Sequence, residues 1–246
     1  MLSADLQSRG VLDVWYVGLD VARESPIAPA CLQSLETILS PDEQARAARF
    51  HFERDRRRFV VCRARLREIL ASYLDAPATA IRFVYGEHGK PALTGPWECN
   101  EISFNLSHSE DLAVIAVARG VEVGIDVECV RPIPEARRIA ERCFSIGERA
   151  ALEKLPAAER PAAFYGVWTR KEACLKAIGT GLSYPLDQID VGLANGYRAS
   201  ALSPFPGRRQ ALEWSVWSVS PAPGYVAAVA STDELPAPDR WQWLAS

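Results

Sequence analysis

The sequence predicts an α+β fold in which one unit, a small mostly antiparallel sheet packed with a long helix, occurs twice. Three observations predict it. Short apolar runs of strand length recur in both halves of the chain. Each half also contains one long amphipathic helical pattern. Finally, the run 113–118 (AVIAVA) resembles the run 225–230 (YVAAVA), and each follows a predicted strand and a polar turn. We place the boundary between residues 1–120 and residues 121–246.

In the N-terminal half, the run Val11–Val17 is rich in Val, Trp and Tyr and predicts an opening strand. Ser40, Pro41 and Glu43 form the start signal of a helix, with Ser at the N-cap and Glu three residues later. A long amphipathic helix follows and ends before Pro77. Its apolar residues at helical spacing are Phe52, Phe59, Leu66, Ile69, Leu70 and Tyr73.

In the C-terminal half, a second capping box at Ser145–Glu148 opens a helix that runs to about Leu155. The second long helix covers Ala162–Ile178, and Gly179 and Gly181 close it. Strands connect these helices in both halves. The further predicted strands are Ile81–Tyr85, Ile102–Leu106, Leu112–Ala118, Val121–Val127, Gln188–Leu193, Leu212–Val219 and Tyr225–Ala230, with a polar segment Ser107–Asp111 between the second and third.

Composition excludes several classes of protein. The chain has 246 residues, of which 48% are hydrophobic and 24% charged, the balance of a soluble globular protein. The apolar run Leu112–Ala118 is far shorter than the roughly 20 residues of a membrane span. The N-terminus carries Asp5, Arg9 and Asp13 and no apolar signal-peptide core. We therefore expect a cytoplasmic protein that does not bind a membrane.

The six cysteines contain no C-x-x-C pair, and the three histidines lie in separate segments, so neither a zinc site nor a disulfide framework is expected. Cys62, Cys143 and Cys174 fall in helical patterns and are interpreted as small core residues.

Basic residues are distributed unevenly. The chain has only four lysines, and nine of its 24 arginines lie between residues 46 and 67, around the first long helix. Acidic residues are interleaved with them, no aromatic platform accompanies them, and the net charge is −3. We therefore favour binding of one small polyanion over binding of nucleic acid.

Two acidic residues interrupt the predicted strand Val121–Val127 and its end. Asp126 and Glu128 lie on the same side of the strand, because side chains alternate. Two neighbouring carboxylates repel each other unless a positive charge neutralises them. A hard divalent cation such as Mg²⁺ does so, since it prefers carboxylate, water and phosphate oxygens. The alternative is an edge strand with a solvated acidic face, and the strand alone does not decide between the two.

The second long helix carries another acidic and basic pair. Glu172 and Lys176 are spaced to form an ordinary surface ion pair worth only about 0.3–0.5 kcal/mol. Trp168 and Leu175 flank the pair on the apolar side of the helix. A third carboxylate and an ammonium group at the edge of a core fit a metal and diphosphate site better.

Two further segments carry anion-binding groups. Residues 86–91 (GEHGKP) combine glycines that permit close backbone approach with Lys90 beside Pro91. Residues 104–109 (FNLSHS) end a strand with Asn105, Ser107 and His108, which can donate hydrogen bonds to an anion. Either segment alone is a common loop. No G-x-S-x-G elbow surrounds Ser107, so a serine hydrolase is not indicated.

Four motifs, taken in their order along the chain, resemble those of the 4′-phosphopantetheinyl transferases of the long, Sfp type. They are G-K-P at 89–91, F-N-x-S-H-S at 104–109, G-I-D-x-E at 124–128 and W-x-x-K-E-A-x-x-K at 168–176. The resemblance extends from about Ser40 to Pro185. It implies a monomeric pseudodimer of two α+β halves. It also implies a reaction in which the phosphopantetheine arm of coenzyme A is transferred to a serine of an apo acyl, peptidyl or aryl carrier protein, releasing adenosine 3′,5′-bisphosphate.

The resemblance also implies roles for individual residues. Asp126, Glu128 and Glu172 would hold Mg²⁺ against the diphosphate, and Glu172 would also accept the serine proton, directly or through water. Lys176 is implied in catalysis as well. The implied contacts to the phosphates and the nucleotide are Lys176, Lys90, Ser107, His108, Arg46 and, as a weaker match, Arg58.

Two positions depart from the family pattern: Glu43 stands where a second basic residue is common, and not every branch has an acid at the position of Glu128. Two other functions remain open at this stage. A metal-dependent hydrolase of coenzyme A or nucleotide diphosphates would share the metal site. A non-catalytic regulator that binds coenzyme A or a carrier would be expected to have lost Asp126, Glu172 or Lys176, and all three are present.

Overall fold

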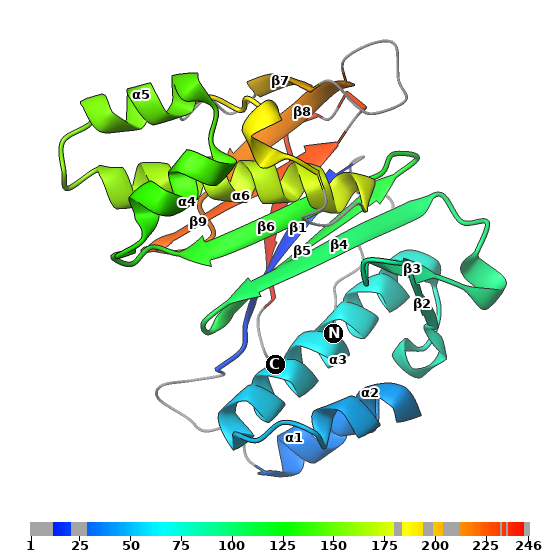
Figure 1. Cartoon of the computed structure of the whole chain (residues 1–246). Coiled ribbons are helices and arrows are strands. Elements are labelled where there is room, and N and C mark those ends of the chain that lie inside the picture. Colours follow the sequence, from blue (N-terminus) through cyan, green and yellow to red (C-terminus); the bar gives the residue numbers. More distant parts are fainter. Residues whose placement is uncertain are drawn as a thin grey trace.

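A computed structural model of the chain describes residues 12–20, 29–179, 184–193, 199–203, 212–231, 233–234 and 236–243. Two four-stranded sheets form the centre of the molecule, and a long helix covers the outer side of each, α3 in cyan and α6 in yellow-green in Figure 1. The α+β class predicted from the sequence is confirmed.

The first sheet has the strand order β10-β1-β5-β4. β1 (Leu12–Gly18), β5 (Leu112–Arg119) and β4 (Ile102–Ser109) pair antiparallel. β10 (Asp239–Gln242) returns from the far end of the sequence and pairs with β1 in parallel. Trp241 of β10 stacks on Trp15 of β1 with ring centroids 5.7 Å apart, which fixes this last strand against the first.

The second sheet is antiparallel throughout, with the order β6-β9-β8-β7. Its strands are β6 (Gly124–Cys129), β9 (Tyr225–Ser231), β8 (Leu212–Val219) and β7 (Ala199–Ser203). A separate hairpin of β2 (Phe83–Tyr85) and β3 (Pro91–Leu93) flanks α3 and carries the loop that contains Lys90.

The helices begin and end close to the predicted signals. Glu43 accepts a hydrogen bond from the Ser40 N–H at 3.0 Å, and the Ser145–Glu148 box is reciprocal, with bonds of 2.8 and 3.1 Å. These bonds satisfy N–H groups that the first helical turn leaves unpaired. The helices are α1 (Pro29–Glu36), α2 (Pro41–Ala47), α3 (Glu53–Leu74), α4 (Ala136–Cys143), α5 (Ile146–Lys154) and α6 (Arg160–Ile178).

Alternation along β5 explains the layered core. Ile115 and Val117 contribute to the cluster beneath α3, whereas Val114 and Ala116 face the cluster between the two sheets. All four side chains are fully buried, so β5 has no solvated face. A third cluster lies between the second sheet and α6. The layers are therefore α3, first sheet, second sheet and α6 (Figure 1).

Gly124 sets the distance between β6 and α6. A Cβ atom at this position would lie 2.2 Å from both the Ala173 carbonyl oxygen and the Ala177 nitrogen, much closer than any van der Waals contact. Glycine therefore lets the strand that carries Asp126 lie directly against the helix that carries Glu172 and Lys176.

Three local predictions were wrong. Gln188–Leu193 is not a strand, because buried Lys171 and Arg170 take the carbonyl oxygens of Ile189 and Gly192 that a strand partner would need. β4 continues to Ser109 instead of ending at Leu106, and only Glu110 and Asp111 form the turn. Phe52 precedes α3 and is 62% exposed, so it does not belong to the core.

The predictions on cysteine burial and on membrane spans can also be compared with the structure. Cys62 and Cys174 are buried as predicted, whereas Cys143 is half-buried. Val11 and Gly181 lie outside the described residues. Within the described ranges, every helix is too short or too polar to cross a bilayer.

Candidate active site

Three segments distant in sequence meet around Asp126. The Lys176 Nζ on α6 donates to the Asp126 Oδ1 at 2.7 Å and to the Ser107 Oγ of β4 at 3.0 Å. The Ser107 hydroxyl donates in turn to the same Asp126 oxygen at 2.8 Å. Asp126 is only 6% exposed, whereas the Lys176 side chain remains 30% exposed. The structure thus joins one carboxylate, one ammonium and one hydroxyl that the motifs had singled out separately.

One oxygen of this cluster is left without a partner. The Asp126 Oδ2 is buried, and within the described part of the chain no hydrogen-bond donor reaches it. An unsatisfied buried carboxylate oxygen is costly, because it has lost its water without gaining a replacement. The cluster is therefore chemically incomplete on one side.

Glu172 lies one helical turn before Lys176. Burial and the negative charges of Asp126 and Glu128 raise the pKa of Glu172 to about 7, while the positive charge of Lys176 opposes this rise. Without a bound cation, the Glu172 carboxyl therefore titrates far closer to neutral pH than an ordinary glutamate, which is typical of functional sites.

Glu128 lies two residues beyond Asp126 on β6 and is half-buried. Its carboxylate accepts a hydrogen bond from the Ser109 Oγ at 2.9 Å. Burial raises the pKa of Glu128, the Ser109 hydrogen bond lowers it, and the charge of Asp126 raises it further. The three carboxylates thus influence one another electrostatically.

The donor chemistry of these residues fits a hard cation. Carboxylate oxygens are the preferred ligands of Mg²⁺, and a cation would satisfy Asp126 Oδ2 and relieve the repulsion that raises the pKa of Glu172. Over the described ranges, no three His, Cys, Asp or Glu side chains lie close enough to form a ready-made metal centre.

On the other side of β4, a cavity of about 590 Å³ is lined by Arg46, Arg58 and His108 together with aromatic side chains. The Arg46 guanidinium lies over the Phe59 ring, 5.2 Å from its centroid. His108 is exposed at this cavity, yet the neighbouring protein removes part of its hydration. This desolvation and the positive charges of Lys176, Arg58 and Arg46 lower the pKa of His108. The cavity is lined by three arginines, Arg46, Arg58 and Arg63, and by the acidic residues Asp55 and Glu110, so its cationic groups outnumber its carboxylates.

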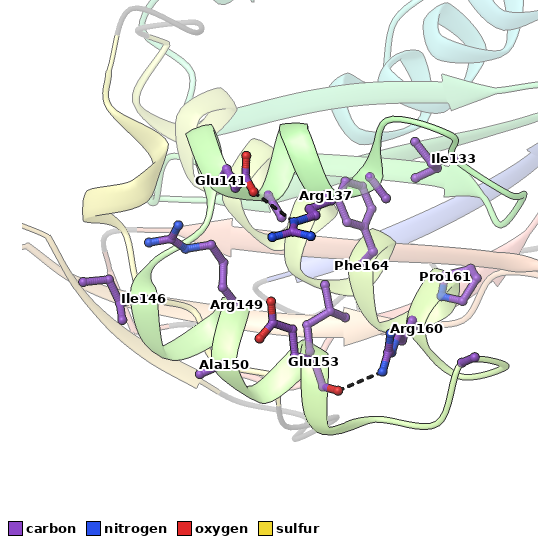
Figure 2. A pocket seen from close by; sticks show the side chains of 14 residues that line it. Ile133, Arg137, Glu141, Ile146, Arg149, Ala150, Glu153, Arg160, Pro161 and Phe164 are labelled. Atoms are coloured by element: carbon purple, nitrogen blue, oxygen red, sulfur yellow. Dashed lines mark hydrogen bonds and ion pairs between the residues drawn. The ribbon is translucent and has the colours of Figure 1, made fainter.

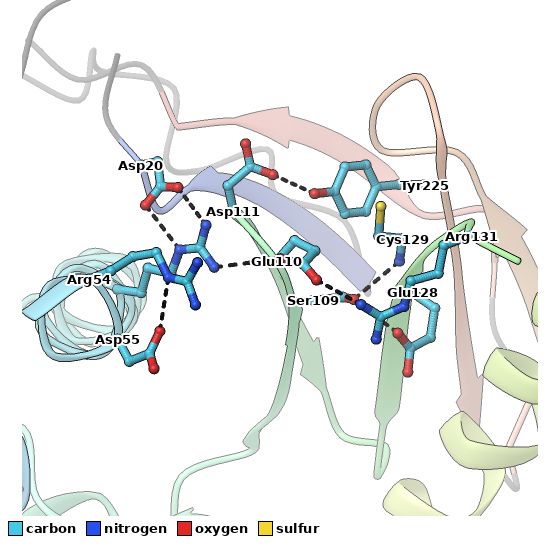
Figure 3. Close-up of polar contacts among 11 residues, drawn as sticks. Asp20, Arg54, Asp55, Ser109, Glu110, Asp111, Glu128, Cys129, Arg131 and Tyr225 are labelled. Atoms are coloured by element: carbon cyan, nitrogen blue, oxygen red, sulfur yellow. Dashed lines mark hydrogen bonds and ion pairs between the residues drawn. The ribbon is translucent and has the colours of Figure 1, made fainter. Parts of the chain in front are cut away.

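Arg58 is already engaged by acidic residues. Its guanidinium donates to both carboxylate oxygens of Asp20, at 3.0 and 2.5 Å, and lies 3.7 Å from Glu110. Figure 3 shows Glu110, in the turn after β4, reaching Arg131 on the other side. Arg46, by contrast, forms no ion pair with any described residue. Of the two arginines predicted from the sequence, Arg46 is the one free to bind an anion directly.

Lys90 is also engaged. Its Nζ donates to the Glu122 carboxylate at 2.7 Å and to the Ala177 carbonyl oxygen at 2.8 Å. The structure therefore places the predicted phosphate ligand at the C-terminal turn of α6, where it bridges the hairpin loop to that helix.

A second cavity lies away from all predicted site residues. It has a volume of about 760 Å³ and lies between α4, α5 and the start of α6, with Phe164 and Ile133 among its apolar walls (Figure 2). Its cations are already bonded in part, since Arg137 pairs with Glu141 and Arg160 donates to backbone carbonyls.

Two family descriptions match this chain. "4′-phosphopantetheinyl transferase, N-terminal" covers residues 25–120, and "4′-phosphopantetheinyl transferase superfamily" covers residues 122–230. The chain belongs to the 4′-phosphopantetheinyl transferase family. This confirms the family that the order of the sequence motifs predicts, and with it the enzyme class.

Individual phosphopantetheinyl transferases are similar over most of their length. HetI of Nostoc sp. is 38% identical over 219 residues, covering 88% of this chain and 86% of HetI. The psf-1 transferase of Bacillus pumilus is 35% identical, covering 70% of this chain and 72% of its own. Sfp of Bacillus subtilis is 30% identical, covering 69% and 73%.

The position of Glu43 explains one departure from the phosphopantetheinyl transferase pattern. Glu43 is buried, and its carboxylate accepts hydrogen bonds from Arg63 and Arg67, each at 2.6 Å. Because two buried guanidinium groups require this charge, a basic residue cannot replace it here without further changes.

Sequence reasoning assigned no role to two polar residues that the structure shows to be important. Lys171, on α6, is fully buried and donates to the Glu148 carboxylate and to two backbone carbonyls. Its identity as one of four lysines in an arginine-rich chain was the available signal. Ser109 closes the F-N-x-S-H-S motif and contacts Glu128. Its spacing of two residues from Ser107 could have placed both on one face of the strand.

Proposed function

We propose that this phosphopantetheinyl transferase moves the 4′-phosphopantetheine group of coenzyme A to a serine of an apo acyl or peptidyl carrier protein, with the chemistry at Asp126, Glu172 and Lys176. The observation that carries the proposal is the incomplete cluster around Asp126, which lies across β4 from a cavity lined by cationic groups. Such an arrangement suits a substrate in which a diphosphate joins a phosphorylated nucleotide to the group that is transferred.

In the proposed reaction, the serine Oγ forms a bond to the phosphorus on the pantetheine side of the diphosphate. The bond from that phosphorus to the bridging oxygen breaks, and adenosine 3′,5′-bisphosphate leaves with the electron pair. Glu172, on the helical turn before Lys176, accepts the serine proton directly or through water. Lys176 stabilises the charge that grows on the phosphates.

Asp126 and Glu172, together with Glu128, would hold Mg²⁺. When bound, this cation would neutralise charge on the diphosphate and so assist departure of the bisphosphate. Ser107 orients Asp126 and Lys176 through its two hydrogen bonds. Arg46 and His108 bind the nucleotide end in the 590 Å³ cavity, with Arg58 behind them and Lys90 bracing the loop beside them.

We further propose that the chain acts in the cytoplasm as a monomeric pseudodimer, with halves at residues 1–120 and 121–246. Each half supplies one long helix and most of one sheet, which supports a duplicated unit, although β10 of the C-terminal half joins the first sheet.

Mass spectrometry of an apo carrier after incubation with coenzyme A and Mg²⁺ tests the function. The carrier is expected to gain the mass of one phosphopantetheine group. A panel of apo carriers from fatty-acid, polyketide and peptide synthesis identifies the preferred type. Cleavage of coenzyme A without any change in the carriers would indicate a hydrolase instead, and binding of coenzyme A without turnover would indicate a regulator.

A further inference from the structure

The two faces of β4 have different partners. Ile102 and Phe104 pack in the core beneath α3. The odd-numbered residues of β4 lie on its other face and are polar, and each of them contacts the segment 121–129, which contains β6. In order, Ser103 donates to the Val121 carbonyl, Asn105 accepts from the Ile125 N–H at 3.0 Å, Ser107 donates to Asp126 at 2.8 Å, and Ser109 donates to Glu128 at 2.9 Å and accepts from the Cys129 N–H at 3.1 Å.

These contacts take the place of main-chain pairing. β4 is the edge strand of the first sheet and β6 is the edge strand of the second, and the two strands lie side by side without belonging to one sheet. The Ile125 and Cys129 N–H groups would otherwise lack a partner, and an unpaired buried N–H is costly. Side chains at every second residue of β4 therefore fix the register of β6.

The Ser109 hydroxyl makes two hydrogen bonds to neighbouring residues of β6. Its hydroxyl accepts from the Cys129 N–H and donates to the carboxylate of Glu128, the residue before Cys129. The hydroxyl thus links the Glu128 side chain to the backbone of its own strand. These two hydrogen bonds restrict rotation about the three side-chain bonds of Glu128, a long and half-buried acidic residue.

We infer that Ser109 is a positioning residue that holds the Glu128 carboxylate beside Asp126, so that both face the same cation. The inference rests on the proposed function, because it assigns Glu128 to the cation. It also gives the second serine of the F-N-x-S-H-S motif a purpose different from that of Ser107, which contacts Asp126 and Lys176.

The strand offers a matched control. Ser103 lies on the same face of β4, and among the described residues its hydroxyl contacts a backbone carbonyl and no carboxylate. Ser103→Ala and Ser109→Ala each remove one hydroxyl, and Ser109→Ala should lower the melting temperature somewhat more, because it also leaves the Cys129 N–H without its acceptor. Ser109→Thr keeps the hydroxyl and serves as the conservative variant.

The test measures Mn²⁺ affinity by electron paramagnetic resonance, on the full chain saturated with coenzyme A and without carrier protein. Loss of a residue that orients a metal ligand typically weakens metal binding about 10–100-fold. We expect a Kd for Mn²⁺ raised at least about tenfold in Ser109→Ala, unchanged in Ser103→Ala and close to wild type in Ser109→Thr.

Equal Mn²⁺ affinity in Ser109→Ala and Ser103→Ala would overturn the inference. Failure of the proposed function looks different, because the wild-type chain would then leave every apo carrier unmodified. A wild type that modifies a carrier and binds Mn²⁺, with a Ser109→Ala variant that binds equally well, refutes the role of Ser109 alone.

Discussion

Two lysines on α6, five residues apart in the sequence, form ion pairs of opposite character. Lys171 is fully buried and donates to Glu148 and to the Leu186 and Ile189 carbonyls, so its three protons all have acceptors. Glu148 also accepts from the Val191 N–H at 2.8 Å. Lys176 instead is partly exposed, and its partner Asp126 keeps one buried oxygen to which no described residue donates.

The difference in hydrogen bonding indicates that the Lys171–Glu148 pair stabilises the fold, whereas the Lys176–Asp126 pair can still bind a ligand. A buried pair contributes to stability only when every polar atom finds a partner, as in the Lys171 cluster. A site that binds anions and cations must keep some hydrogen-bond donors or acceptors unpaired until the ligand binds, as the Asp126 cluster does. We therefore expect substitutions in the two clusters to affect different measurements.

The largest expected effect lies in the Asp126 cluster. Glu172→Gln preserves side-chain size but cannot accept a proton, so we expect kcat to fall about 10²–10⁴-fold, the usual contribution of a general base. Binding of coenzyme A should be retained at saturating Mg²⁺. Steady-state kinetics on an apo carrier measure both. Full recovery of kcat at high Mg²⁺ or with Mn²⁺ would show that Glu172 is only a ligand and that the serine proton leaves by another route.

The next effect concerns stability. Lys171→Met leaves Glu148 buried and without its ammonium partner, which should cost about 3–5 kcal/mol of unfolding free energy. Lys176→Met is the matched variant on the same helix and should cost less, about 1–3 kcal/mol, because Lys176 is 30% exposed although Asp126 is buried. Denaturant unfolding measures both values. Similar losses in the two variants would remove the distinction between the clusters.

A smaller effect follows from the Glu172 carboxyl. Its pKa is raised to about 7 in the folded chain from the ordinary value of 4.5, so the folded state holds this proton more tightly than the unfolded state. Stability of the metal-free protein should therefore fall as the pH rises from 4.5 to 7. In the presence of EDTA, Glu172→Gln should melt a few degrees higher than wild type at pH 7 and at the same temperature near pH 4. An unchanged difference across this range would contradict the assignment.

The smallest effect is expected at Lys90. Lys90→Ala removes the bonds to Glu122 and Ala177 and loosens the loop beside the 590 Å³ cavity. The KM for coenzyme A should rise several-fold, with little change in the affinity for the apo carrier. A rise in carrier KM alone would place Lys90 on the protein-binding side of the enzyme.

Local patterns in the sequence predicted most of the elements and the Asp126 cluster. The capping boxes at Ser40 and Ser145 are short-range signals and were reliable for that reason. Asp126, Ser107 and Lys176 could be grouped because each lies in a recognisable motif. The partners of Arg58 and Glu43 could not be predicted, since Asp20 and Arg63 lie 38 and 20 residues away and no local pattern relates them.

The same limit explains the error at Gln188–Leu193. This apolar segment has the composition of a strand, but buried cations from α6 compete for its carbonyl groups. Tertiary context therefore overrides local preference. β10 was missed for the converse reason, because its four residues, DRWQ, form too short a run to signal a strand.

The return of β10 to β1 makes the first sheet dependent on a segment that is synthesised long after β1. The Trp241 indole N–H donates to Asp13 at 2.8 Å, across 228 residues of sequence. Until those residues leave the ribosome, β1 presents an open edge, which is the kind of surface that pairs with other chains. Folding of the two halves therefore cannot be sequential and independent. A fragment that ends before β10 should therefore aggregate through the open edge of β1.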